Sequence, residues 1–149
     1  MILNDNQLTG LPGKVDSICS LGTLIANNNK ITALPEEIGH FKNLEEIQLQ
    51  NNSITVLPKG IGSLKNLKTM DLSNNPLASL PPEMGQMQSL EWINLRDTKI
   101  KDVPLELAQV KSLHKLYLTP GLIPDDQKKV IKNKFTNPKV VMFNPPTSY

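Results

Sequence analysis

Residues 67–81 read LKTMDLSNNPLASLP and contain the pattern on which the rest of the chain is built. Apolar residues recur at fixed intervals, an asparagine follows the alternating part, and the segment closes with Leu80-Pro81. The same arrangement begins 23 residues earlier at Leu44, another 23 residues earlier at Leu21, and 23 residues later at Leu90. A strict repeat of this length predicts stacked units, each of which buries its apolar side against its neighbours.

The units share the pattern L-x-x-L-x-L-x-x-N-x-L-x-x-L-P, which resembles the leucine-rich repeat family over about residues 1–123. The L-P-x-x-I-G-x-L segments resemble its 23-residue intracellular, Ras-suppressor-like class. This resemblance implies an α/β solenoid with a parallel β-sheet on the concave face and short 3₁₀ or helical turns on the convex face. It also implies a signalling or scaffolding role, and it transfers no catalytic residue, because one fold hosts many activities.

The residues of each unit support this reading directly. Residues 46–50 alternate polar and apolar, which predicts a strand whose Ile47 and Leu49 point inward. An asparagine then stands where the chain leaves the strand; the resemblance implies that it is buried and bonds backbone groups of neighbouring turns. This structural ladder comprises Asn6, Asn29, Asn52, Asn75 and, with a hydroxyl in place of the amide, Thr98.

The repeat pattern ends near Ile123, so we divide the chain into repeats over residues 1–123 and a C-terminal cap over residues 124–149. About ten residues separate each Leu-Pro from the next strand, which predicts 3₁₀ turns, although residues 105–111 lack glycine and proline and could form a fuller helical turn. Pro124 followed by two aspartates opens a helical pattern. Its expected apolar face comprises Val130, Ile131 and Phe135, and an extended tail around residues 140–146 follows.

The first unit is truncated, because Leu3 and Leu8 already belong to the second half of the pattern. Terminal repeats need a cap, since an open end exposes apolar surface and strand edge. We therefore expect one of three situations. The chain is part of a longer solenoid, another chain or a second copy covers the edge near residues 2–4, or the open edge is tolerated.

Composition narrows the function classes. The net charge is +2, which is too small to indicate nucleic-acid or membrane binding, and no apolar run is long enough for a membrane helix. A single cysteine, Cys19, and the lack of a leader sequence favour a reducing, cytoplasmic location. His40 and His114 fall on different faces of the repeat, so we expect no catalytic site, metal or cofactor.

The outward strand positions form aligned columns, which predicts a partner-binding concave face. Its centre is expected at Trp92, Arg96 and Tyr117, residue types that dominate binding hot spots. Acidic residues, with Glu45 beside them, lie on the earlier strands and basic residues on the later ones, a gradient that would orient a partner of mixed charge. The other candidates are Asn94, Lys115, Asp71, Gln48, Gln50 and Glu46.

These observations predict a non-catalytic protein–protein interaction scaffold whose partner they do not name. One alternative is a recognition fragment of a larger enzyme, such as a kinase or ubiquitin ligase. Another is a structural subunit of a large assembly in which neighbouring chains cover the N-terminal edge. Nucleic-acid binding is disfavoured because the concave columns carry no continuous basic stripe.

Overall fold

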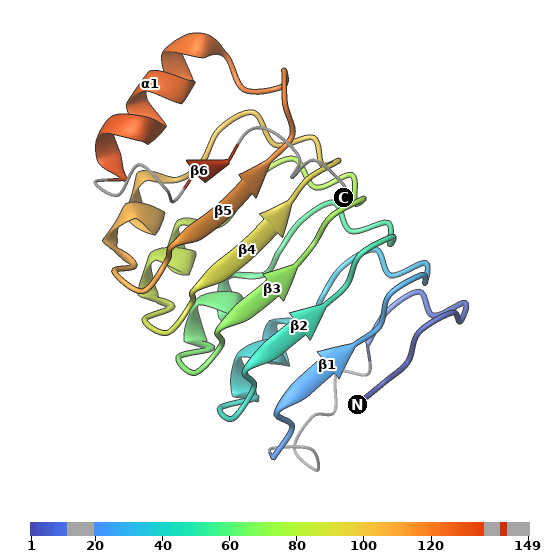
Figure 1. Ribbon diagram of the computed structural model, residues 1–149. Coiled ribbons are helices and arrows are strands. Elements are labelled where there is room, and N and C mark those ends of the chain that lie inside the picture. Colours follow the sequence, from blue (N-terminus) through green and yellow to red (C-terminus); the bar gives the residue numbers. More distant parts are fainter. Residues whose placement is uncertain (12–19, 136–140, 143–149) are drawn as a thin grey trace, which may run out of the picture.

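The computed structural model describes residues 1–11, 20–135 and 141–142 and shows a single stack of repeats along one sheet (Figure 1). Its six parallel strands follow each other in sequence order. Their register advances by one repeat per strand, so that Thr23 pairs with Glu46, and Glu46 with Thr69. The predicted parallel sheet is confirmed. The strands are β1 (Thr23–Ile25), β2 (Glu46–Gln48), β3 (Thr69–Asp71), β4 (Trp92–Leu95), β5 (Lys115–Leu118) and β6 (Val141–Met142).

Short 3₁₀ helices stack behind the sheet, as predicted (Figure 1). They are η1 (Glu36–His40), η2 (Lys59–Ser63), η3 (Pro82–Gln86) and η4 (Leu105–Gln109). The expectation of a fuller helical turn over residues 105–111 is wrong, because η4 has the same five residues as the other 3₁₀ helices. Only about ten residues connect Pro104 to β5, and η4 must match the height of η3 beside it.

The core between the two layers is aliphatic and continuous. In the central unit Leu67, Met70, Leu72 and Leu77 are fully buried. Their counterparts in neighbouring units are buried in the same way, so each repeat is covered by the next. This is the packing that the 23-residue period predicts, since no single unit could bury these residues alone.

A column of glycines allows the 3₁₀ helices to stack closely. A Cβ at Gly85 would lie 2.6 Å from the carbonyl oxygen of Glu106 in the next helix, and one at Gly62 would collide with the carbonyl of Glu83. Ala108 occupies this position in η4. The next element along the stack is then the α-helix α1 (Asp125–Lys134), which packs against η4, so the close 3₁₀ contact ends there.

A second column forms the turn after each strand. Asp5, Asn28, Asn51, Asn74 and Asp97 all have φ between 55° and 58°. Among non-glycine residues, asparagine and aspartate tolerate this left-handed conformation best. Their side chains also join neighbouring units, because Asn51 Nδ2 donates to Asn28 Oδ1 at 2.7 Å and Asn28 Nδ2 to Asp5 Oδ1 at 2.7 Å.

The two ends of the stack differ. At the N-terminal end, the backbone of Leu3 donates to Ile25 at 2.7 Å and Ile2 is 72% exposed. At the other end, Ile131 and Phe135 of the α1 region are buried, whereas Val130 is 39% exposed, contrary to expectation. Residues four apart share a helix face, and Val130 lies about 100° around the helix from Ile131.

Parts of the sequence-based predictions fall outside the described residues. These are Cys19, the predicted helix end at residues 136–138 and the tail from residue 143 onward. The division at residue 123 into repeats and cap stays a prediction.

Candidate binding face on the concave sheet

The outward positions of the strands form columns on one side of the sheet, which we call the concave face. The register places Trp92 beside Thr69 on one side and Lys115 on the other. It places Asn94 between Asp71 and Tyr117 in the next column. The predicted candidates on β3, β4 and β5 are therefore neighbours in space.

Trp92, Arg96 and Tyr117 touch one another and form what we call the Trp92 cluster. The Trp92 and Tyr117 rings meet edge to face, with centroids 6.0 Å apart and an interplanar angle of 65°. The Arg96 guanidinium lies 4.3 Å from the centroid of the Tyr117 ring. Edge-to-face rings and a cation over an aromatic face are both favourable arrangements. All three residues are half-buried, so each still presents surface to solvent.

Asp71 is bonded within the sheet. One carboxylate oxygen accepts from the Ser73 backbone at 2.9 Å and from its hydroxyl at 2.6 Å. Asn94 Nδ2 donates to both carboxylate oxygens at 3.2 Å, and Asn94 Oδ1 accepts from the Arg96 backbone at 3.3 Å. Asp71 and Asn94 therefore support the strand that carries the Trp92 cluster. Sequence reasoning placed Ser73 in a column but missed this role.

The earlier strands carry a separate polar network. Gln48 Nε2 donates to Glu46 at 2.6 Å, and Gln48 Oε1 accepts from Asn27 at 3.2 Å. Asn27 is 5% exposed and its side-chain oxygen accepts from the Gln50 backbone at 3.1 Å. Asn27 was not predicted as a site residue. Its signal was the run of three asparagines at residues 27–29.

Ion pairing changes the predicted charge gradient. Lys68 Nζ lies 2.7 Å from a carboxylate oxygen of Glu45, and this hydrogen bond raises the pKa of Lys68. Glu45 is thus neutralised locally, and Asp71 is held by neutral donors. Lys115 is exposed, whereas Glu46 is half-buried. The described concave face is therefore less acidic at its earlier strands than the sequence alone suggests.

The asparagine ladder lies directly beneath the ends of the strands. Asn75 is 2% exposed; its amide donates to the carbonyls of Leu49 and Leu72 at 2.9 and 3.0 Å, and its oxygen accepts from the Ile54 backbone at 3.0 Å. Asn29 and Asn52 bond in the same way. Asn6 is exposed and bonds only to carbonyls of its own unit.

Two hydroxyls replace the ladder amide in the following unit. Thr98 Oγ1 donates to the Leu95 carbonyl at 2.7 Å, while Thr119 Oγ1 accepts from the Thr98 backbone at 3.3 Å. The described bonds of Thr98 do not reach back to Leu72 as an asparagine amide would.

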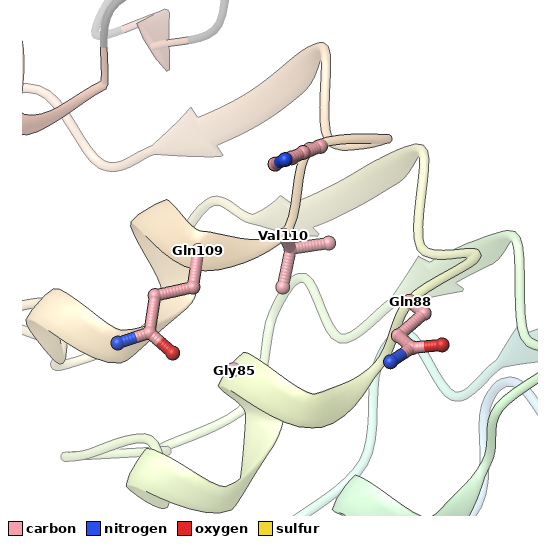
Figure 2. A pocket seen from close by; sticks show the side chains of 5 residues that line it. Gly85, Gln88, Gln109 and Val110 are labelled. Atoms are coloured by element: carbon pink, nitrogen blue, oxygen red, sulfur yellow. The ribbon is translucent and has the colours of Figure 1, made fainter.

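Two surface depressions lie away from the concave face. One, of about 340 Å³, is lined by Gly85, Gln88, Gln109, Val110 and Lys111 near the ends of η3 and η4 (Figure 2). The other, also of about 340 Å³, lies beside Val56, Pro81, Pro82 and Glu83.

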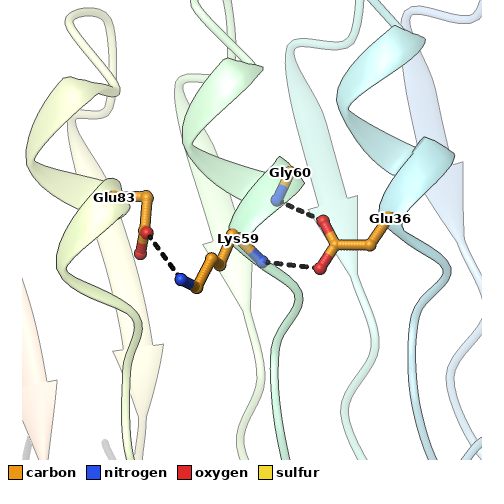
Figure 3. A network of polar contacts seen from close by, with 4 residues as sticks. All are labelled: Glu36, Lys59, Gly60 and Glu83. Carbon is orange, nitrogen blue, oxygen red and sulfur yellow. Dashed lines mark hydrogen bonds and ion pairs between the residues drawn. The ribbon is translucent and has the colours of Figure 1, made fainter.

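A polar network borders the second depression (Figure 3). The Glu36 carboxylate accepts from the backbones of Lys59 at 3.2 Å and Gly60 at 2.7 Å, and Lys59 Nζ lies 3.7 Å from Glu83. Because Lys59 and Gly60 begin η2, Glu36 caps that 3₁₀ helix from the neighbouring unit. We assign this network to stacking of the repeats.

Within the described ranges, no group of three or more metal-ligating side chains occurs. None of the described helices is long and apolar enough to cross a membrane.

The comparisons with known proteins agree with this geometry. The model of the leucine rich repeat family matches residues 19–77 and 65–120. A leucine-rich repeat protein of Leptospira interrogans is 36% identical, with a TM-score of 0.86 over 95% of this chain and 37% of its own. A comparison with functionally curated proteins finds no match.

Two further solved structures share the fold. An internalin of Listeria monocytogenes is 19% identical, with a TM-score of 0.73 over 95% of this chain and 40% of its own. A plant peptide hormone receptor, solved in complex with RGF2, is 27% identical, with a TM-score of 0.74 over 95% of this chain and 23% of its own.

The chain belongs to the leucine-rich repeat family. It spans 37% of the length of the Leptospira protein, so it corresponds to a part of that relative.

Proposed function

We propose that this chain is a non-catalytic protein–protein interaction scaffold that binds its partner on the concave face, centred on the Trp92 cluster. The observation that carries the proposal is the mutual contact of Trp92, Arg96 and Tyr117, all half-buried on adjacent strands. Tryptophan, tyrosine and arginine supply most binding energy in protein interfaces. The similar plant receptor was solved with a bound partner, which supports a binding role for the fold.

The face is also prepared for binding by its internal bonds. Asp71 and Asn94 hold β3 and β4 in register, and Asn94 in turn bonds the backbone of Arg96. A rigid anchor loses little conformational entropy when a partner docks. We assign the direct contacts to the Trp92 cluster and Lys115, peripheral contacts to Gln48, Gln50 and Glu46, and a supporting role to Asp71 and Asn94. The proposed location is the cytoplasm.

Trp92→Ala tests this proposal. We expect the variant to keep its fold and to bind the partner at least about 30-fold more weakly, since truncating a hot-spot residue costs about 2 kcal/mol or more. Thr69→Ala is the matched control, because Thr69 occupies the same column on the neighbouring strand. Partners captured from the native cell by the unaltered chain would be purified and their affinities for the three proteins measured. Equal affinities for the unaltered chain and Trp92→Ala would exclude a concave-face hot spot.

We further propose that the N-terminal edge pairs with another chain or a second copy. Residues 1–5 lie along β1, and Ile2 is 72% exposed on the open edge of the sheet. Exposed strand edges offer unpaired backbone groups to other chains, and lysine on such an edge blocks pairing. If the edge self-associates, the solution mass will rise with concentration for the unaltered chain and remain monomeric for Ile2→Lys. A concentration-independent monomer would exclude self-association.

A further inference from the structure

We propose that the depression beside Gly85 and Gln109 binds a primary ammonium group, supplied by a lysine side chain of a partner protein. The site lies near the ends of η3 and η4, away from the Trp92 cluster (Figure 2). It therefore stands independently of the function proposed for the concave face.

The two preceding units show what this position normally holds. Lys42 Nζ donates to the carbonyl of Gly39 at 2.7 Å. One repeat later, Lys65 Nζ donates to the carbonyl of Gly62 at 3.0 Å and to the carbonyl of Gln86 at 2.9 Å. The second ammonium thus bridges two successive 3₁₀ helices, and hydrogen bonds from a charged donor are stronger than neutral ones.

The third unit repeats the acceptors but lacks the lysine. Advancing Lys65 by one period of 23 residues gives Gln88, while Gly62 and Gln86 become Gly85 and Gln109. Among the described residues, neither Gln88 nor Lys111 donates to the carbonyls of Gly85 and Gln109. The depression is lined by these four residues and Val110. Its volume of about 340 Å³ lies where the repeat pattern places an ammonium.

The chemistry of the lining fits a lysine side chain. An ammonium has three donors, and the carbonyls of Gly85 and Gln109 and the side-chain oxygens of Gln88 and Gln109 are acceptors around the site. Val110 offers apolar surface for the methylene stem, as lysine stems commonly pack while the charge stays polar.

Lys111 lines the site but does not prevent a cation from binding. It stands one repeat beyond Gln88, just as Lys65 stands one repeat beyond Lys42. Lys42 and Lys65 both bond carbonyls at their own positions in the structure. Ammonium groups in adjacent units are therefore compatible with this spacing.

The direct test is an NMR titration of the full chain with n-butylammonium, followed by backbone amide signals. We expect saturable shifts at Gly85, Gln109 and Val110. In Gln88→Lys the chain supplies its own ammonium, so the apparent affinity of the probe should fall about tenfold or more. In Lys65→Gln a second response should appear around Gly62 and Gln86. Shifts that never saturate, or an identical response in Gln88→Lys, would overturn the proposal.

Two further probes decide the charge and the source of the ligand. Titration with n-butyrate should give no response at these amides; saturable binding of butyrate would assign the site to anions through Lys111 and overturn the proposal. A blocked Gly-Lys-Gly peptide should bind at least as tightly as n-butylammonium, and its norleucine counterpart should not bind. A lysine peptide that binds more weakly than n-butylammonium would overturn the assignment to a partner's lysine.

Discussion

Replacing Asn75 by alanine should destabilise this protein more than replacing its counterpart Asn52, although the two asparagines occupy identical places in the repeat. Both amides bond carbonyls of two units, and both oxygens accept one backbone N–H. The difference lies in what remains bonded after truncation.

In Asn52→Ala, the carbonyls that lose a donor keep another one. The Ala26 carbonyl still accepts from Asn29 at 3.2 Å, and the Leu49 carbonyl still accepts from Asn75 at 2.9 Å. Among the described bonds, only the Ile31 backbone N–H loses its partner. A buried unsatisfied group costs about 1–3 kcal/mol, so we expect a loss of about 2 kcal/mol in the free energy of unfolding.

In Asn75→Ala, two buried backbone groups lose their only described partner. The Ile54 N–H loses the Asn75 oxygen, and the Leu72 carbonyl has no second donor because Thr98 bonds Leu95 instead. The expected loss is about 4 kcal/mol, from two groups at roughly 2 kcal/mol each. Asn6→Ala is the matched control, since Asn6 is exposed and we expect less than about 0.5 kcal/mol.

Urea unfolding of the three variants, followed by circular dichroism and by the fluorescence of Trp92, measures these differences. Coincident transitions by the two probes are required, because stacked repeats can unfold in parts. Equal losses for Asn75→Ala and Asn52→Ala would refute the reasoning about shared acceptors. A loss for Asn75→Ala no larger than that for Asn6→Ala would show that the buried ladder contributes nothing.

Two further predictions concern the helices behind and beyond the sheet. Gly62→Ala should destabilise the protein by about 1–3 kcal/mol in urea unfolding, because its Cβ would collide with the next 3₁₀ helix, whereas Gly22→Ala, whose Cβ would meet nothing closer than 4.0 Å, should be neutral or slightly stabilising. The hydrogen bond from Lys128 lowers the pKa of Asp125, so the stabilisation it gives is present above the unfolded-state pKa and is lost as the pH falls through the lowered folded-state pKa. Carboxyl NMR titration of Lys128→Gln should show the pKa of Asp125 rising toward its ordinary value; an unchanged pKa would contradict this cause.

The fold could be predicted from the sequence because its period fixes the register. Once Leu44 and Leu67 are aligned, Glu46 must lie beside Thr69, as the structure shows. The doublets Asn51-Asn52 and Asn74-Asn75 also carried a signal that the sequence analysis did not use. Their first members have positive φ, and aspartate or asparagine at that place in every unit indicates a left-handed turn.

The finer organisation of the concave face could not be predicted, because it depends on side-chain rotamers. The sequence shows Asp71 as an outward acidic residue, whereas the structure turns its carboxylate onto Ser73 and Asn94. Pairing of Glu45 with Lys68 likewise joins residues on neighbouring units through long, flexible side chains. A column alignment gives the position of each residue but does not give its bonding partner.

The departures from the repeat are concentrated in one part of the stack. Lysine becomes Gln88, the ladder asparagine becomes Thr98, and the stacking glycine becomes Ala108. The Trp92 cluster belongs to the same two units. Ala108 is explained by the change from a 3₁₀ neighbour to α1, and Thr98 is compensated by the hydroxyl of Thr119. Gln88 has no such compensation among the described residues. Because local rules tend to be broken at functional sites, the uncompensated position is where a bound group is expected to complete the structure.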